Sequence, residues 1–142
     1  MSLPIQIADA VLQKIKESFP DIKAERRYVA SLELKDTKET RIIVVPKDIG
    51  YERASRSHNN VQVAVDVALM KKFQKGDAAE LDPLCETVEQ ILKLFDSKPL
   101  GDALCLKAQN DPIYAQEHYE KWRQFTSLIT LTFLCYESGV GR

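Results

Sequence analysis

Apolar side chains recur at intervals of three and four residues in two stretches of the chain, and this spacing predicts two amphipathic helices. The first spans about 5–19 and ends before Pro20, because proline lacks the backbone donor that a helix interior needs. The second spans about 77–95, with Asp77 as its expected N-cap. The side chains expected to face the core from these helices are Ile7, Val11, Ile15, Leu84, Cys85, Val88, Ile91 and Phe95.

Elsewhere in the chain, apolar residues alternate with polar ones, as they do in half-buried strands. The expected strands cover 26–35, 40–45, 61–70, 103–108 and 125–136. Both faces of the run 40–45 are apolar, which predicts a central strand. The segment 114–124 fits either a helical turn or a loop. The strand side chains expected to point into the core include Tyr28, Leu32, Val61, Val63, Val65, Val67, Leu69, Leu104, Leu106, Ile129, Leu131 and Phe133.

A polar and basic segment at 47–60 separates two of these strands, and it contains the turn formers Gly50, Asn59 and Asn60. We expect an extended hairpin arm there. The order of elements is then α-β-β-(arm)-β-α-β-β. Short connections between strands, with helices at the start and in the middle, predict an α+β fold: a mostly antiparallel sheet with two main helices packed on it.

The composition is that of one globular domain covering residues 1–142. Hydrophobic residues make up 44% and charged residues 29% of the chain, and the net charge is −1, which excludes a disordered protein. A chain of this length buries enough surface to fold without disulfides or a structural metal. The charge is uneven, with +4 over residues 1–75 and −5 over residues 76–142. Such a two-sided protomer suits head-to-tail contact between copies, although the same pattern is common in monomers.

The three cysteines, Cys85, Cys105 and Cys135, lie far apart and form no CxxC pair, which argues against a zinc ribbon or a disulfide framework. We therefore expect neither a metal nor a cofactor. Apolar runs in the chain are shorter than a membrane span or a signal-peptide core. The sequence predicts a protein made in a reducing cytoplasm without membrane contact.

Catalytic signatures such as GxGxxG, the P-loop, HExxH and GxSxG do not occur in the sequence. His118 could act as an acid or base with Glu117 and Tyr119, but a histidine in a polar connecting segment is more often a surface residue. Cys85 has no His or Asn at a motif spacing, which favours a core residue over a nucleophile. We expect that the chain is not an enzyme.

The remaining candidate site is a set of basic residues: Arg26, Arg27, Arg41, Lys47, Arg53, Arg56, Lys71 and Lys72. If the fold brings them together, they could contact phosphate groups. The other interpretation is solvated charge or salt bridges between subunits. It is favoured because the chain is slightly acidic and its aromatic residues are not interleaved with the basic ones.

Several local strings, taken with the order of elements, resemble a known group of proteins. The strings are Ile7–Val11, Arg26–Val29, Val44–Lys47, Ala54–Arg56, Val65–Lys72, Pro112–Tyr114 and Arg123–Thr132. From about residue 7 to 136 the chain resembles small structural proteins from the neck of phages and prophages. The order of elements is similar to that of the tail terminator family, which includes the minor tail protein U of a long-tailed phage.

The resemblance implies a viral structural protein of the virion neck, without catalysis and assembled in the host cytoplasm. Six copies would form a ring that ends the tail tube and joins tail to head. The implied partners are further copies of the chain, the tail tube protein, and head-completion or connector proteins. Contact with DNA in the channel would be weak and non-specific at most.

Within this interpretation, the arm residues expected to contact a neighbouring subunit or ring are Lys47, Tyr51, Arg53, Arg56 and His58. The basic residues expected at the channel or at an interface are Arg26, Arg27, Lys71 and Lys72. A tail-completion or head-closure protein of the same neck fits the sequence as an alternative. A small nucleic-acid-binding regulator or enzyme is the alternative from a different class.

Overall fold

The computed structural model describes residues 2–29, 38–53 and 58–138. Three helices and six strands follow one another in this part of the chain. They are α1 (Leu3–Ser18), β1 (Lys23–Arg26), β2 (Arg41–Arg53), β3 (His58–Lys72), α2 (Ala78–Phe95), β4 (Pro99–Leu100), β5 (Ala103–Asn110), α3 (Gln116–Trp122) and β6 (Gln124–Ser138). None of the helices in these residues is long and apolar enough to cross a membrane.

The strands form one six-stranded sheet in the order β1-β2-β3-β6-β5-β4. The pair β1–β2 is parallel, and the other four pairs of neighbours are antiparallel. The longest pairing joins β3 to β6, from His58 opposite Ser138 to Lys72 opposite Gln124. The predicted fold class, an α+β domain with a mostly antiparallel sheet and two main helices packed on it, is confirmed.

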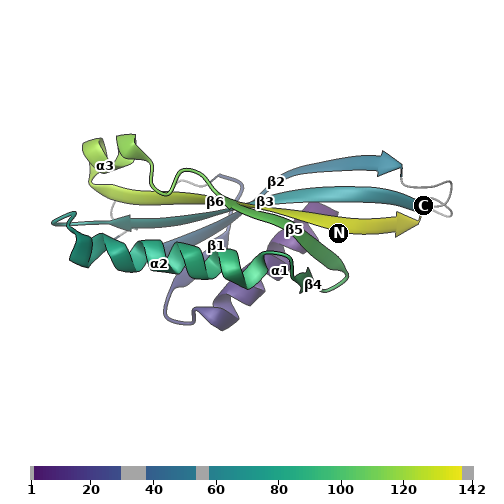
Figure 1. Ribbon diagram of the computed structural model, residues 1–142, viewed down its shortest axis with the longest axis horizontal. Coiled ribbons are helices and arrows are strands. Elements are labelled where there is room, and N and C mark those ends of the chain that lie inside the picture. The colour runs from purple at the N-terminus through teal and green to yellow at the C-terminus, as the bar shows by residue number, and fades with distance from the viewer. Residues whose placement is uncertain (1, 30–37, 54–57, 139–142) are drawn as a thin grey trace.

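The core lies between one face of the sheet and the helices α1 and α2 (Figure 1). Helix α1 is bounded by Pro4 in its first turn and ends at Ser18, and Asp77 caps α2 by accepting the backbone N–H of Glu80 at 3.1 Å. Alternating residues of β3 and β6 supply the sheet side of this core, as their period of two predicts. The core cluster includes Ile7, Val11, Ile15, Val61, Val63, Val65, Val67, Leu69, Leu84, Val88, Ile91, Phe95, Ile129, Leu131 and Phe133.

The first predicted strand is misplaced in the described part of the chain. The pattern predicts a strand from residue 26 onward with Tyr28 inward, whereas β1 ends at Arg26 and Tyr28 is 71% exposed. The strand forms earlier because Ala24 packs against the core and the Arg26 guanidinium pairs with Asp9 of α1. Contacts with the helix therefore decide the position of β1. The positions 30–35 of that prediction lie outside the described residues.

The predicted phase of β5 is also wrong. Leu104 and Leu106, expected to face the core, are 42% and 43% exposed, while Ala103 and Cys105 are buried. The small residues Ala103 and Cys105 face the core because β5 passes close to the end of α2. There the Cys105 N–H donates to the Lys98 carbonyl. A bulge between Cys105 and Lys107 then shifts the register against β6.

The long strands β2, β3 and β6 run beyond the helices toward one end of the molecule, on the right in Figure 1. Helix α3 lies at the opposite end (Figure 1). The segment 47–60 belongs to the hairpin of β2 and β3, whose strands continue up to Arg53 and start again at His58. The molecule thus has a strand-built end and an end built from α3 and the loop between β3 and α2.

Candidate functional site

One edge of the sheet is open along the outer half of β2. Strand β1 pairs with β2 from Arg41 to Val44, and in the described residues no strand pairs with β2 on that side beyond Val44. Ile49 and Tyr51 are exposed on this half, at 38% and 63%. An unpaired strand edge presents free backbone donors and acceptors to other chains. We call β2 from Val45 to Arg53 the open edge.

The predicted arm residues fall on or near the open edge, but they are not equivalent. The Lys47 ammonium lies 3.8 Å from Asp66 Oδ1, and Thr130 donates to the same oxygen at 2.7 Å, so Lys47 is engaged within its own chain. Tyr51 is free to meet a partner, since it is strongly exposed. Backbone positions of Arg53 and His58 mark the strand ends, and Arg56 lies outside the described residues.

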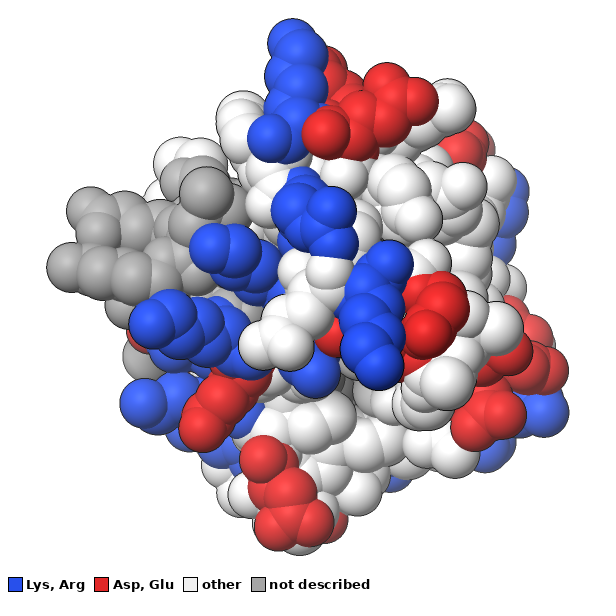
Figure 2. Space-filling model, turned by 90° about the vertical axis from the view of Figure 1, so that its left-hand side faces the viewer, with Lys and Arg blue, Asp and Glu red and all other residues white. Residues whose placement is uncertain are grey.

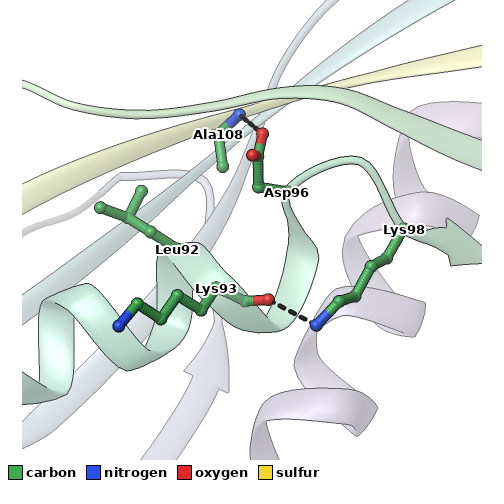
Figure 3. Close-up of a pocket in the computed structure, with 5 residues that line it drawn as sticks. All are labelled: Leu92, Lys93, Asp96, Lys98 and Ala108. Atoms are coloured by element: carbon green, nitrogen blue, oxygen red, sulfur yellow. Dashed lines mark hydrogen bonds between the residues drawn. The ribbon is translucent and has the colours of Figure 1, made fainter.

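The other edge of the sheet is closed by the chain itself, at a hollow of about 360 Å³ between α2 and β5 (Figure 3). Asp96 Oδ1 accepts the Ala108 N–H at 3.3 Å, and the Lys98 ammonium donates to the Lys93 carbonyl at 2.7 Å. The first bond ties the end of α2 to β5, and the second closes the loop after α2 back onto the helix. The polar groups of the hollow thus stabilise the fold. This edge bonds to its own chain, whereas the outer half of β2 is open to other chains in the described residues.

Basic side chains gather at the end of the molecule that Figure 2 shows. Lys71 and Lys72 end β3, and Arg41 lies opposite Met70 on the neighbouring strand. Arg123, just before β6, lies beside these residues. Its carbonyl accepts the Phe73 N–H at 2.8 Å, and its guanidinium donates to the Gln74 carbonyl. We call this surface the basic end. It comprises Lys71, Lys72, Lys75, Lys121 and Arg123.

The predicted residues Arg26 and Arg27 do not extend freely into this surface. Arg26 Nε lies 2.6 Å from Asp9 Oδ1, and hydrogen bonds to the Tyr28 side chain and to Asp9 raise the pKa of Arg26. Arg27 Nε lies 3.1 Å from Glu25 Oε1, the oxygen that also pairs with Arg41 at 3.0 Å. Both arginines are thus paired with carboxylates of their own chain.

The basic end includes residues that the sequence did not single out. Lys75, Lys121 and Arg123 join Lys71 and Lys72 because β3 and β6 pair to their ends, from His58 to Lys72. Arg123 meets Gln74 across 49 positions of sequence. Local spacing carries no signal for such a contact, and the pairing of the two alternating strands would have been needed to find it.

Aromatic side chains pack against residues of the basic end. Phe73 packs on Tyr119 with ring centroids 4.6 Å apart, and the Arg123 guanidinium lies 5.5 Å from the centre of the Phe73 ring. Trp122 packs on His118, and it remains 45% exposed. A cation held over an aromatic face is stabilised by the ring quadrupole. The surface thus combines charge with exposed aromatic area.

The groups once considered for acid–base chemistry have other partners. His118 Nδ1 lies 2.8 Å from Thr126 Oγ1, the Lys121 ammonium pairs with Glu117 at 3.0 Å, and the Tyr119 hydroxyl donates to the Gly76 carbonyl at 3.2 Å. Burial raises the pKa of the Cys85, Cys105 and Cys135 thiols, which disfavours the reactive thiolate. Among the residues that the structure describes, no group of three or more His, Cys, Asp or Glu side chains is placed to hold a metal ion.

Comparison with known proteins found solved structures that resemble this chain. No family model matches the chain, and no curated protein matches it. A solved sheath/tube terminator of an extracellular contractile injection system, in its extended state, is 13% identical with a TM-score of 0.48. The match covers 99% of this chain and 58% of the terminator chain. At that TM-score the likeness supports no conclusion about this chain.

A second solved protein, described without a function, is similar over its whole length. It is 14% identical with a TM-score of 0.50, and the match covers 100% of this chain and 99% of the other. At this identity the likeness concerns the fold alone. The arrangement of sheet and helices found here therefore occurs as a complete protein elsewhere.

Proposed function

We propose that the chain is a structural subunit of the neck of a phage or prophage tail, and that six copies form a ring that ends the tail tube and joins it to the head. The open edge of β2 is the observation that carries this proposal. A ring subunit must contact copies of itself and a second ring, and a strand that has no neighbour on one side within the described part of the chain, with exposed Ile49 and Tyr51, is suited to such contact. The resemblance of the sequence to neck proteins supports the same role.

In this proposal the hairpin of β2 and β3 reaches the neighbouring subunit or the adjoining ring. The described parts of its strands run beyond the helices (Figure 1), and Tyr51 on β2 is exposed there. The partners are the tail tube protein on one side and head-completion or connector proteins on the other. The site of assembly is the host cytoplasm, and the final location is the virion.

We also propose that the chain is not catalytic. The raised pKa of the Cys85, Cys105 and Cys135 thiols and the bonds of His118, Glu117 and Tyr119 to other groups support this. Each of these side chains has a role in packing or hydrogen bonding.

Polymerisation of the tail tube tests the proposal. Adding the chain to polymerising tube protein should shorten the tubes and leave a ring at their ends, as seen by electron microscopy. The double variant Ile49→Ser with Tyr51→Ser should keep its thermal midpoint and lose this capping, since both side chains are exposed. Gln90→Ser, at an exposed position of α2, is the matched control and should cap normally. Tubes of unchanged length with wild-type chain would contradict the proposal.

A further inference from the structure

The exposed side of α2 carries acidic residues opposite to its buried stripe. Asp82, Glu86 and Glu89 are spaced four and three residues apart, so they share one face of the helix. Helix α2 begins at the end of the molecule where α3 lies and runs from there along its long side (Figure 1). Glu89 pairs with Lys93 at 3.3 Å, and both side chains remain largely exposed. We call Asp82, Glu86 and Glu89 the acidic flank.

The basic end is held in a fixed shape by a carboxylate of α2. The loop N–H groups of Lys75 and Gly76 both donate to Glu80 Oε1 at 2.8 Å, and that of Gln74 donates to Oε2 at 2.9 Å. Glu80 is therefore committed to the loop, while Lys72, Lys75 and Lys121 remain exposed around it. A rigid charged surface loses little conformational entropy on binding.

We infer that the basic end of one copy binds the acidic flank of α2 in the next copy, and that this contact, repeated around the ring, closes it. The inference rests on the proposed function, because it names the surfaces through which the proposed ring assembles. A ring built by rotation needs two different surfaces of one chain that complement each other. The lysines of the basic end lie on β3, the loop after it and α3, whereas the acidic flank lies on the outer side of α2, and the two sets have opposite charge.

A copy of the chain fits the basic end better than a nucleic acid does. Acidic side chains lie among the basic ones on this surface (Figure 2), so the positive charge is interrupted and offers no continuous path for a phosphate backbone, whereas three carboxylates on one helix face can meet separate lysines. The exposed Trp122 and Tyr114 beside the charges are typical of protein interfaces, where aromatic residues and arginine are enriched. Because the charged side chains are exposed, the contact should weaken as salt rises.

The test reverses the charge of each surface in a separate variant and then mixes the two variants. In the end variant, Lys72, Lys75 and Lys121 are changed to Glu; in the flank variant, Asp82, Glu86 and Glu89 are changed to Lys. Each variant alone brings like charges together, and the concentration for half-assembly should rise about tenfold or more, the combined effect of several exposed pairs. Mixed in equal amounts, the two variants present complementary surfaces at every contact, and rings of alternating copies should return.

A matched control and a chemical probe make the result specific. Lys16, Lys23 and Lys107 are exposed lysines outside the basic end, and changing them to Glu gives the same change in net charge without loss of assembly. A carbodiimide joins contacting lysines and carboxylates directly. Applied to mixed ¹⁴N- and ¹⁵N-labelled copies of the wild-type chain, it should link basic-end lysines to the acidic flank between copies. Thermal melts of every variant establish that it is folded.

The outcomes separate this inference from the proposed function. Normal rings from both variants, or links between copies that map elsewhere, would overturn the inference while the ring remains. Absence of both rings and links in the wild-type chain, with and without tail tubes, would contradict the proposed function and the inference with it. Tight duplex DNA binding that the end variant loses while rings persist would show that the basic end serves a nucleic acid, which also overturns the inference.

Discussion

The carboxylate of Glu80 accepts the backbone N–H of Gly76 at 2.8 Å, which joins the first turn of α2 to the loop that follows β3. The same carboxylate accepts the N–H groups of Gln74 and Lys75. Hydrogen bonds from the backbone of Gln74 and Gly76 lower the pKa of Glu80 below its ordinary value of 4.5. One side chain thus sets the conformation of the basic end.

This arrangement predicts a contribution to stability that depends on pH. Because the pKa of Glu80 is lower in the folded chain than in the unfolded one, the contribution is present above pH 4.5 and is lost as the pH falls through the folded value. Glu80→Gln should lower the unfolding midpoint at neutral pH and flatten the loss of stability in acid. Denaturant melts from about pH 7 to about 3 measure this. Equal acid slopes for wild type and Glu80→Gln would refute it, and Glu86→Gln on the exposed side of α2 is the control.

The glycines predict a graded series of substitutions. Gly76 has φ +71°, and a Cβ there would lie 2.9 Å from Phe73 Cε2, whereas Gly101 has φ +61° with nothing within 4 Å. Gly76→Ala should therefore destabilise the chain more than Gly101→Ala, which meets only the cost of the left-handed backbone, about 1–2 kcal/mol. Gly50→Ala, in open space without a positive φ, should be close to neutral or stabilising. Thermal midpoints in any other order would contradict this prediction, because the loop at Gly76 would then have shifted to make room for the added Cβ.

The core predicts a large cost for truncating α2. Ile91 is fully buried and shares the core with Val65 and Val67 of β3. Ile91→Ala should cost about 2–5 kcal/mol of unfolding free energy, as buried aliphatic truncations do. The exposed neighbour Gln90→Ala should change it by about 0.5 kcal/mol or less. A loss at Ile91 as small as that at Gln90 would mean that α2 does not pack on the sheet.

Binding to DNA should be weak and independent of sequence. Six copies of Lys71, Lys72 and Lys75 would place many positive charges in one ring, yet each protomer carries a net charge of −1. Non-specific contact with phosphates falls steeply with salt, so duplexes of different sequence should bind alike at low salt and release at physiological salt. Fluorescence titration of labelled duplexes measures this. High affinity for one sequence would favour a regulator over a structural ring.

The sequence predicted the elements with strong periodicity and missed what long-range contacts decide. The alternation of Val61 to Leu69 and the stripe of α2 predicted the core correctly, because burial on one face requires those periods. The position of β1 depends on the contact of Arg26 with Asp9, and the phase of β5 depends on the passage of Cys105 past the end of α2. Neither contact is visible in local spacing.

For the candidate surfaces as well, the sequence indicated some residues correctly but could not show which of them lie together. The exposed position of Tyr51 agrees with a polar segment between strands, whereas Lys47, chosen for its charge, turned out to pair with Asp66. The convergence of Lys75 and Arg123 with Lys71 required the full pairing of β3 with β6. Charge in a sequence thus identified candidate residues, and the topology decided which of them act together.

Single-particle electron microscopy of the purified chain, alone and incubated with tail tubes, tests the central claim most directly. The account predicts six-fold rings with a central opening, each with six times the 16.1 kDa mass of the protomer, free in solution or seated at the end of a tube. Particles of monomer size that form no ring under either condition would contradict it.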